Sequence, residues 1–144
     1  MPKFPTLSNE INEKLLNVVQ QRVSDYLEEY FDSSEITVQD GITSFSYGTV
    51  NVFIQVKPWH FDDALVYVYS YLAENVKLDF ERAQILLRLN ATVPFGSFGV
   101  IFDNTVIFSY SLPGKNLDSE EFLAAVQTVA TIADNYDEMI LEMK

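Results

Sequence analysis

Cysteine is absent from this chain of 144 residues, and histidine occurs only once. Without cysteine there can be no disulfide, no thiolate zinc site and no thiol catalysis. Long apolar runs are also missing: no window approaches the roughly 20 apolar residues of a membrane span, and the first residues lack the apolar core of a signal peptide. We therefore expect a cytoplasmic protein that does not enter a membrane.

Basic residues are scarce, with 9 lysines and arginines against 21 acidic residues and a formal net charge of −12. Such a charge repels phosphate backbones, and no basic stripe offsets it locally. Nucleic-acid binding is therefore not expected. Apolar residues make up 48% of the chain and aromatic residues 14%, enough to fill the core of a single domain over residues 1–144.

Apolar residues recur with helical spacing in three segments. These run from Ser8 to about Phe31, from Phe80 to Asn90 after an Asp79 N-cap, and from Ser119 to Met143 after an Asp118 N-cap. Alternating apolar residues bounded by turn residues predict five strands, at 43–47, 50–57, 64–72, 98–102 and 105–112.

The predicted elements follow one another as α-β-β-β-α-β-β-α, with no repeat or linker, which indicates a single α+β domain. Pro58 is expected to end the second strand, because proline cannot donate to a strand neighbour. Asp103-Asn104 is expected to join the last two strands in a two-residue turn, because both residue types tolerate a positive φ.

Three tyrosines, Tyr67, Tyr69 and Tyr71, share one face of the third predicted strand, and Phe53 lies on a strand that we expect to pair with it. One interpretation is an aromatic platform, on the sheet face away from the helices, that stacks on an incoming peptide. The other is ordinary tyrosines, half-buried on a sheet with their hydroxyl groups in water.

The second predicted helix is apolar over more than half of its circumference, which is typical of a helix with more than one burial partner. We predict that it forms a homodimer contact. The alternative is that its apolar side chains all belong to the core of one subunit. The residues predicted for the dimer interface are Phe80, Ile85, Leu86 and Leu89.

Candidates for catalysis or metal binding are few. His60 lies near Asp62 and Asp63 but lacks a further ligand, so we predict no metal site. Carboxylates also cluster at helical spacing near the end of the chain, where we interpret them as the solvated face of the last helix rather than an acid–base pair. These are Asp134, Asp137 and Glu138. We therefore predict no catalytic residue and no cofactor.

Three short motifs accompany this order of elements: Leu-Leu-Arg-Leu-Asn-Ala at 86–91, Pro-Phe-Gly-Ser-Phe-Gly at 94–99 and Ala-Asp-Asn-Tyr-Asp-Glu at 133–138. Together they resemble the YbjN family, within the type III secretion chaperone-like superfamily. The resemblance implies a sheet covered by helices, a tendency to dimerise through the helix at 80–90, and peptide or protein binding without catalysis. Nothing in the chain itself points to a secretion system.

The sequence thus favours a non-catalytic module that binds an unidentified polypeptide client in a chaperone-like or regulatory role, as a homodimer. Burial of apolar client side chains on the aromatic platform would supply the affinity, and the acidic surface would steer association. Two alternatives remain at this point: a small carboxylate- or metal-dependent hydrolase, and a structural subunit with no client.

Overall fold

The computed structural model of the protein describes residues 2–144. Over this range it contains α1 (Glu13–Tyr30), α2 (Phe80–Asn90) and α3 (Ser119–Leu141). None of these helices is long and apolar enough to cross a bilayer. The remaining elements are two short 3₁₀ turns and six strands: η1 (Ser33–Glu35), η2 (Phe102–Asn104), β1 (Thr37–Gln39), β2 (Ile42–Tyr47), β3 (Val50–His60), β4 (Asp63–Ala73), β5 (Ser97–Ile101) and β6 (Thr105–Pro113).

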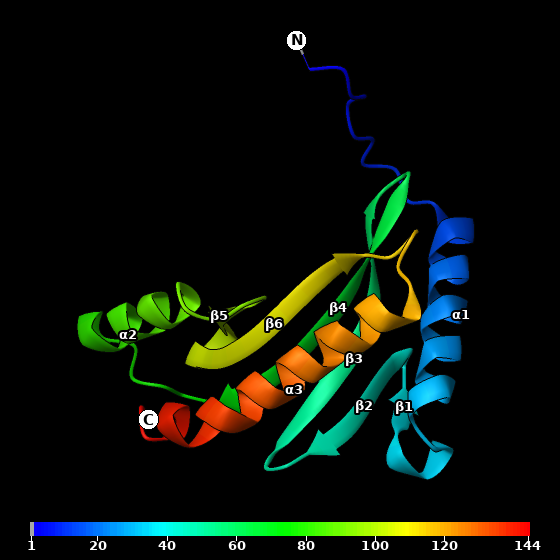
Figure 1. Ribbon diagram of the computed structural model, residues 1–144. Coiled ribbons are helices and arrows are strands. Elements are labelled where there is room, and N and C mark those ends of the chain that lie inside the picture. Colours follow the sequence, from blue (N-terminus) through cyan, green and yellow to red (C-terminus); the bar gives the residue numbers. More distant parts are fainter. Residues whose placement is uncertain (1) are drawn as a thin grey trace.

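The six strands form one antiparallel sheet in the order β1-β2-β3-β4-β6-β5. Figure 1 shows α3 crossing one face of this sheet, with α1 beside it and α2 at the far edge, next to β5. The predicted α+β fold, with a sheet covered by helices, is confirmed. The order leaves β1 and β5 as the two edge strands, whereas β3 and β4 are central.

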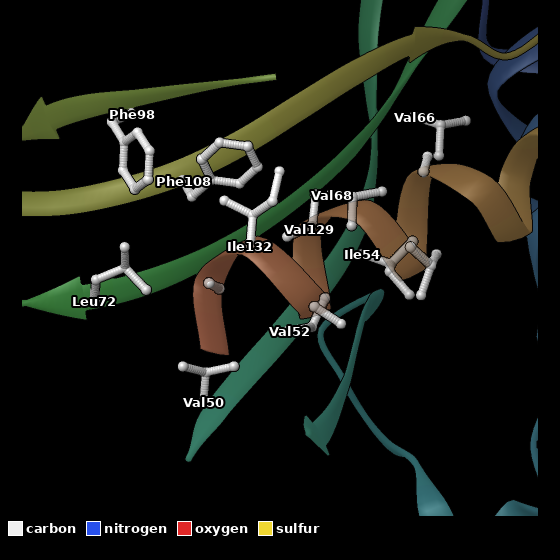
Figure 2. Packing of buried hydrophobic residues seen from close by; sticks show 14 of the residues in the cluster. Val50, Val52, Ile54, Val66, Val68, Leu72, Phe98, Phe108, Val129 and Ile132 are labelled. Atoms are coloured by element: carbon white, nitrogen blue, oxygen red, sulfur yellow. The ribbon is translucent and has the colours of Figure 1, made fainter. Parts of the chain in front are cut away.

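The core lies between the sheet and the helices. Val52 and Ile54 of β3 and Val66 and Val68 of β4 are almost completely buried on the same face, opposite Val129 of α3 (Figure 2). Burial of each such side chain contributes about 1.5–3 kcal/mol to stability. The β-branched residues that favour strands are therefore the ones that hold α3 against the sheet.

Each of the three helices begins after a residue whose side chain caps the helix N-terminus. The Asp79 carboxylate accepts a hydrogen bond from the backbone N–H of Arg82 at 2.9 Å, and Asp118 accepts one from Glu121 at 2.7 Å. Both predicted caps are confirmed. The first helix starts later than the predicted Ser8, because Asn12 supplies the cap; the preceding backbone instead bonds to the β3–β4 turn at Phe61.

The strands differ from the prediction in two places. β1 is an additional strand of three exposed residues, too short and too polar to give an alternating pattern. β3 does not end at Pro58 but continues to His60. Because the pairing of β2 with β3 stops at Ile54, Pro58 has a strand neighbour only on the β4 side, where it lies opposite Ala64. An edge position of this kind tolerates proline.

The positive φ values predicted for the turn between the last two strands are confirmed, but the connection has three residues, Phe102–Asn104, rather than two. Asp103 has a φ of 59° and Asn104 a φ of 52°, both in the left-handed region. A short polar side chain that can bond locally makes this region accessible to these residue types.

The free edge of β5 is partly blocked by the last residue of α2. The side-chain amide of Asn90 donates to the carbonyl of Phe98 at 3.0 Å, and its oxygen accepts from the N–H of the same residue at 2.6 Å. Alternate residues of an antiparallel strand direct their backbone groups away from the partner strand. Asn90 therefore takes the place that a further strand would occupy at Phe98.

We expect Asn90→Ala to lower the free energy of unfolding by about 1–2 kcal/mol, because the amide and carbonyl of Phe98 lose their partner. Urea unfolding followed by circular dichroism measures this difference. Asn135→Ala, at an exposed position of α3, is the matched control and should stay within about 0.5 kcal/mol of the parent chain. Equal changes for the two variants would contradict the assigned role of Asn90.

Candidate functional site

The sheet face opposite α1 and α3 carries the predicted aromatic platform. One row of directly opposed residues crosses the entire width of the sheet on this face. In order from β1 to β5 the row consists of Thr37, Ser44, Phe53, Tyr69, Ser109 and Ser97. Aromatic rings thus occupy the middle of the face, on β3 and β4, and small hydroxyl side chains lie on both sides.

Four rings form a continuous cluster around Tyr69, which we call the aromatic face. The Tyr69 ring stacks on Phe53 at 5.3 Å and on Tyr67 at 4.6 Å between centroids, and meets Tyr71 edge-on at 5.5 Å. Such pairs contribute about 0.5–1.5 kcal/mol each beyond the area they bury. The four residues predicted for this site therefore form one connected cluster, with Tyr69 in contact with each of the other three.

Exposure within the cluster is uneven. Tyr71 keeps 47% of its surface accessible, whereas Tyr69 keeps only 5%; Phe53 and Tyr67 are half-buried. The central ring is thus covered by its neighbours, and the outer rings present the accessible aromatic surface. Tyr69 therefore supports the cluster from within, whereas Tyr71 leaves part of its ring exposed to solvent.

Polar groups surround the rings. The Tyr69 hydroxyl donates to the side-chain oxygen of Gln55 at 3.4 Å, and burial, together with the neighbouring Tyr71 hydroxyl, raises the pKa of Tyr69 to about 12. On the Tyr67 side of the aromatic face, the Lys57 ammonium lies over the Tyr67 ring, 4.3 Å from its centroid. This distance is within the range of a cation–π interaction.

A hollow of about 250 Å³ opens on the aromatic face where the β1–β2 hairpin meets β3 and β4. The hairpin supplies five of its lining residues: Thr37, Gln39, Asp40, Ile42 and Ser44. Phe53, Tyr69 and Tyr71 supply the aromatic part of the lining. The sequence prediction missed the hairpin residues, because it did not include the strand β1.

A second apolar surface, which we call the α2–β5 face, lies at the opposite edge of the sheet. Of the four residues predicted for a dimer interface, Phe80 is 79% exposed, Ile85 and Leu89 are half-buried, and Leu86 is buried against the core of its own chain. Leu87, which was not among them, is 68% exposed. Helical spacing alone could not tell which side of α2 contacts β5. The exposed apolar residues of this face are Leu78, Phe80, Leu87 and Val100.

Of the three acidic residues near the end of α3, Glu138 is exposed, as predicted for a solvated face, whereas Asp134 and Asp137 contact the β2–β3 turn. Asp137 is buried, and its carboxylate accepts a hydrogen bond from the Thr49 hydroxyl at 2.5 Å. Asp134 accepts from the Thr49 N–H at 2.9 Å, and its Oδ1 atom also lies 3.0 Å from the Thr49 Oγ1 atom. The β2–β3 turn packs so closely here that a Cβ on Gly48 would lie 2.2 Å from Asp134. These two carboxylates therefore fasten a turn to a helix.

The remaining candidate for catalysis or metal binding is also accounted for. The Nδ1 atom of His60 accepts a hydrogen bond from the Asp62 N–H at 3.1 Å. The Asp63 carboxylate accepts from the N–H groups of Ala64 and Lys115 at 2.7 and 2.9 Å. Across residues 2–144, no three side chains of the metal-binding types lie close enough together to hold an ion.

The raised pKa of Tyr69 makes stability depend on pH in the alkaline range. The unfolded tyrosine ionises near pH 10, whereas the folded one keeps its proton until about pH 12, so the free energy of unfolding should fall as pH rises between these values. Tyr69→Phe should lessen this fall. Urea unfolding at several pH values measures it, with the exposed Tyr47→Phe as control. A parallel loss in Tyr69→Phe and the parent chain would contradict the assignment.

Comparison with solved structures finds the same fold in a chain of the "Crystal Structure of the ExsC-ExsE Complex". The TM-score is 0.64 with 14% sequence identity, and the match covers 88% of the present chain and 96% of the other. This likeness supports the three-helix, six-stranded α+β architecture. A comparison with curated protein sequences finds no match.

Residues 17–143 match the family model described as T3SS (YopN, CesT) and YbjN peptide-binding chaperone 1. The match begins in α1 and extends beyond α3, so it includes both the aromatic face and the α2–β5 face. Members of this chaperone family are typically non-catalytic. The chain belongs to the family of type III secretion and YbjN peptide-binding chaperones.

Proposed function

We propose that this protein binds an extended segment of a polypeptide client on the aromatic face and acts as a non-catalytic, cytoplasmic chaperone-like or regulatory module. The observation that carries this proposal is the ring cluster of the aromatic face, which borders an open hollow on the sheet face opposite the helices. Aromatic side chains dominate binding surfaces because they offer a large contact area at low entropic cost.

The carboxylates give no comparable support to a hydrolase. Asp134 and Asp137 are hydrogen-bonded to Thr49, and Asp63 to backbone amides, so these acids already have partners. Acid–base catalysis needs a carboxyl group aimed at a substrate site with a matched pKa. The family match also favours binding over catalysis. The fold of the chain is found in a structure of two proteins in complex, which agrees with a client-binding role.

We further propose that the protein is a homodimer held by the α2–β5 face. Phe80 and Leu87 of α2 and Val100 of β5 leave apolar surface exposed that their own subunit does not cover. A groove of about 250 Å³ runs between the helix and the strand, lined by residues of both. A contiguous exposed apolar surface of this kind marks a contact site, and a second copy offers a surface of the same chemistry.

Selection from a phage-displayed library of random heptapeptides tests the client site. The parent chain should enrich binding peptides, and Tyr71→Ser should weaken the selected peptides by about tenfold or more, since the variant loses an accessible ring but little of the core. Tyr47→Ser is a matched control, because Tyr47 is 45% exposed but lies outside the aromatic face. If no peptide is enriched, or if both variants bind equally, the proposed site is wrong.

Light scattering tests the dimer. The parent chain should have twice the 16.5 kDa subunit mass at micromolar concentration. Leu87→Asp should give monomers, because a charge cannot be buried in an apolar contact without a partner. Val18→Asp, which places the same charge at an exposed apolar site on α1, should remain dimeric. A monomeric parent chain would overturn the proposal.

A further inference from the structure

The hollow on the aromatic face combines rings with oxygen atoms. Phe53, Tyr69 and Tyr71 provide ring surface, and the β1–β2 hairpin adds the Asp40 carboxylate at its turn. Neither lysine nor arginine lines the hollow. Drug-sized ligands occupy pockets of about 300–1,000 Å³. At about 250 Å³, this hollow suits one side chain of a bound peptide better than an entire small molecule.

The electrostatics of this lining favour a cation. Aromatic faces carry negative potential, which attracts ammonium and guanidinium groups placed over the rings. Asp40, which lines the same hollow, adds a negative charge. A guanidinium can lie flat against a ring while its N–H groups reach a carboxylate or hydroxyl oxygen. Both partners are present within the same hollow.

The aromatic face already holds one cation of its own. The Lys57 ammonium lies 4.3 Å from the centroid of the Tyr67 ring, which stacks on Tyr69. Tyr69 in turn lines the hollow. One end of the ring cluster is therefore covered by an internal basic side chain, whereas the Asp40 end has the same aromatic chemistry without one. The net charge of −12 also draws basic segments toward the protein.

We propose that the hollow is a subsite for an arginine or lysine side chain of the bound client, seated over Tyr71 and Phe53 and paired with Asp40. This inference rests on the proposed function, since it requires a peptide on the aromatic face. It adds a preference for extended client segments that carry a basic residue among apolar ones. The apolar neighbours contact the other rings, and the basic residue sets the register.

The library selection described above, repeated at about 0.3 M salt to screen diffuse attraction, reads out this preference. Peptides enriched by the parent chain should contain arginine or lysine at one recurrent position. Asp40→Asn should abolish that enrichment and weaken a selected arginine peptide by about fivefold. Asparagine is compatible with the backbone at this turn, where Asp40 has a φ of 52°. Replacing the peptide arginine by citrulline should have a similar effect in the parent chain and a smaller one in Asp40→Asn, where only the attraction of the rings is left to lose.

Asp62→Asn is the matched control, because it changes the net charge equally at the exposed β3–β4 turn; it should keep the enrichment. Loss of enrichment in both variants would reduce the preference to general charge attraction and overturn the subsite. Enriched peptides that need Tyr71 but show no basic position would overturn the subsite while leaving the proposed function intact. If no peptide is enriched at all, the proposed function fails and the subsite fails with it.

Discussion

Side chains alternate between the two faces of β3 and β4, and this alternation governs both the stability and the surface of the molecule. Val52, Ile54, Val66 and Val68 are directed to one side, where α3 buries them. The alternate residues of the two strands are directed to the other side and include Phe53, Tyr67, Tyr69 and Tyr71. Because the side-chain period of a strand is two, a slip of one residue would exchange these sets. The core therefore fixes where the aromatic face is.

Much of the fold could be predicted because its strongest determinants are local. The N-caps at Asp79 and Asp118 and the positive-φ turn at Asp103-Asn104 depend only on nearby residues. The two errors in the strands depend on distant neighbours. Whether Pro58 ends a strand depends on which strand lies beside it, and three exposed residues become β1 only because β2 is there to pair with them.

The aromatic cluster was predictable from alternation, but its internal order was not. Spacing places Tyr67, Tyr69 and Tyr71 on one face, yet only packing determines that the middle ring is buried and the last is accessible. The hollow depends on the β1–β2 hairpin, which no local pattern connects to β4. Likewise, the tie between Asp137 and Thr49 joins residues 88 positions apart. Interactions over such distances cannot be read from periodicity.

The amide of Asn90 also limits how copies of this protein can associate through their backbones. Open-ended growth of a β-sheet from subunit to subunit requires two edge strands with unpaired backbone groups on every subunit. At β5 the side chain of Asn90 occupies the hydrogen-bonding groups of Phe98, which leaves the three residues of β1 as the more accessible border. A strand that added to β5 would therefore have to displace the Asn90 side chain from Phe98, which disfavours growth of the sheet at this edge.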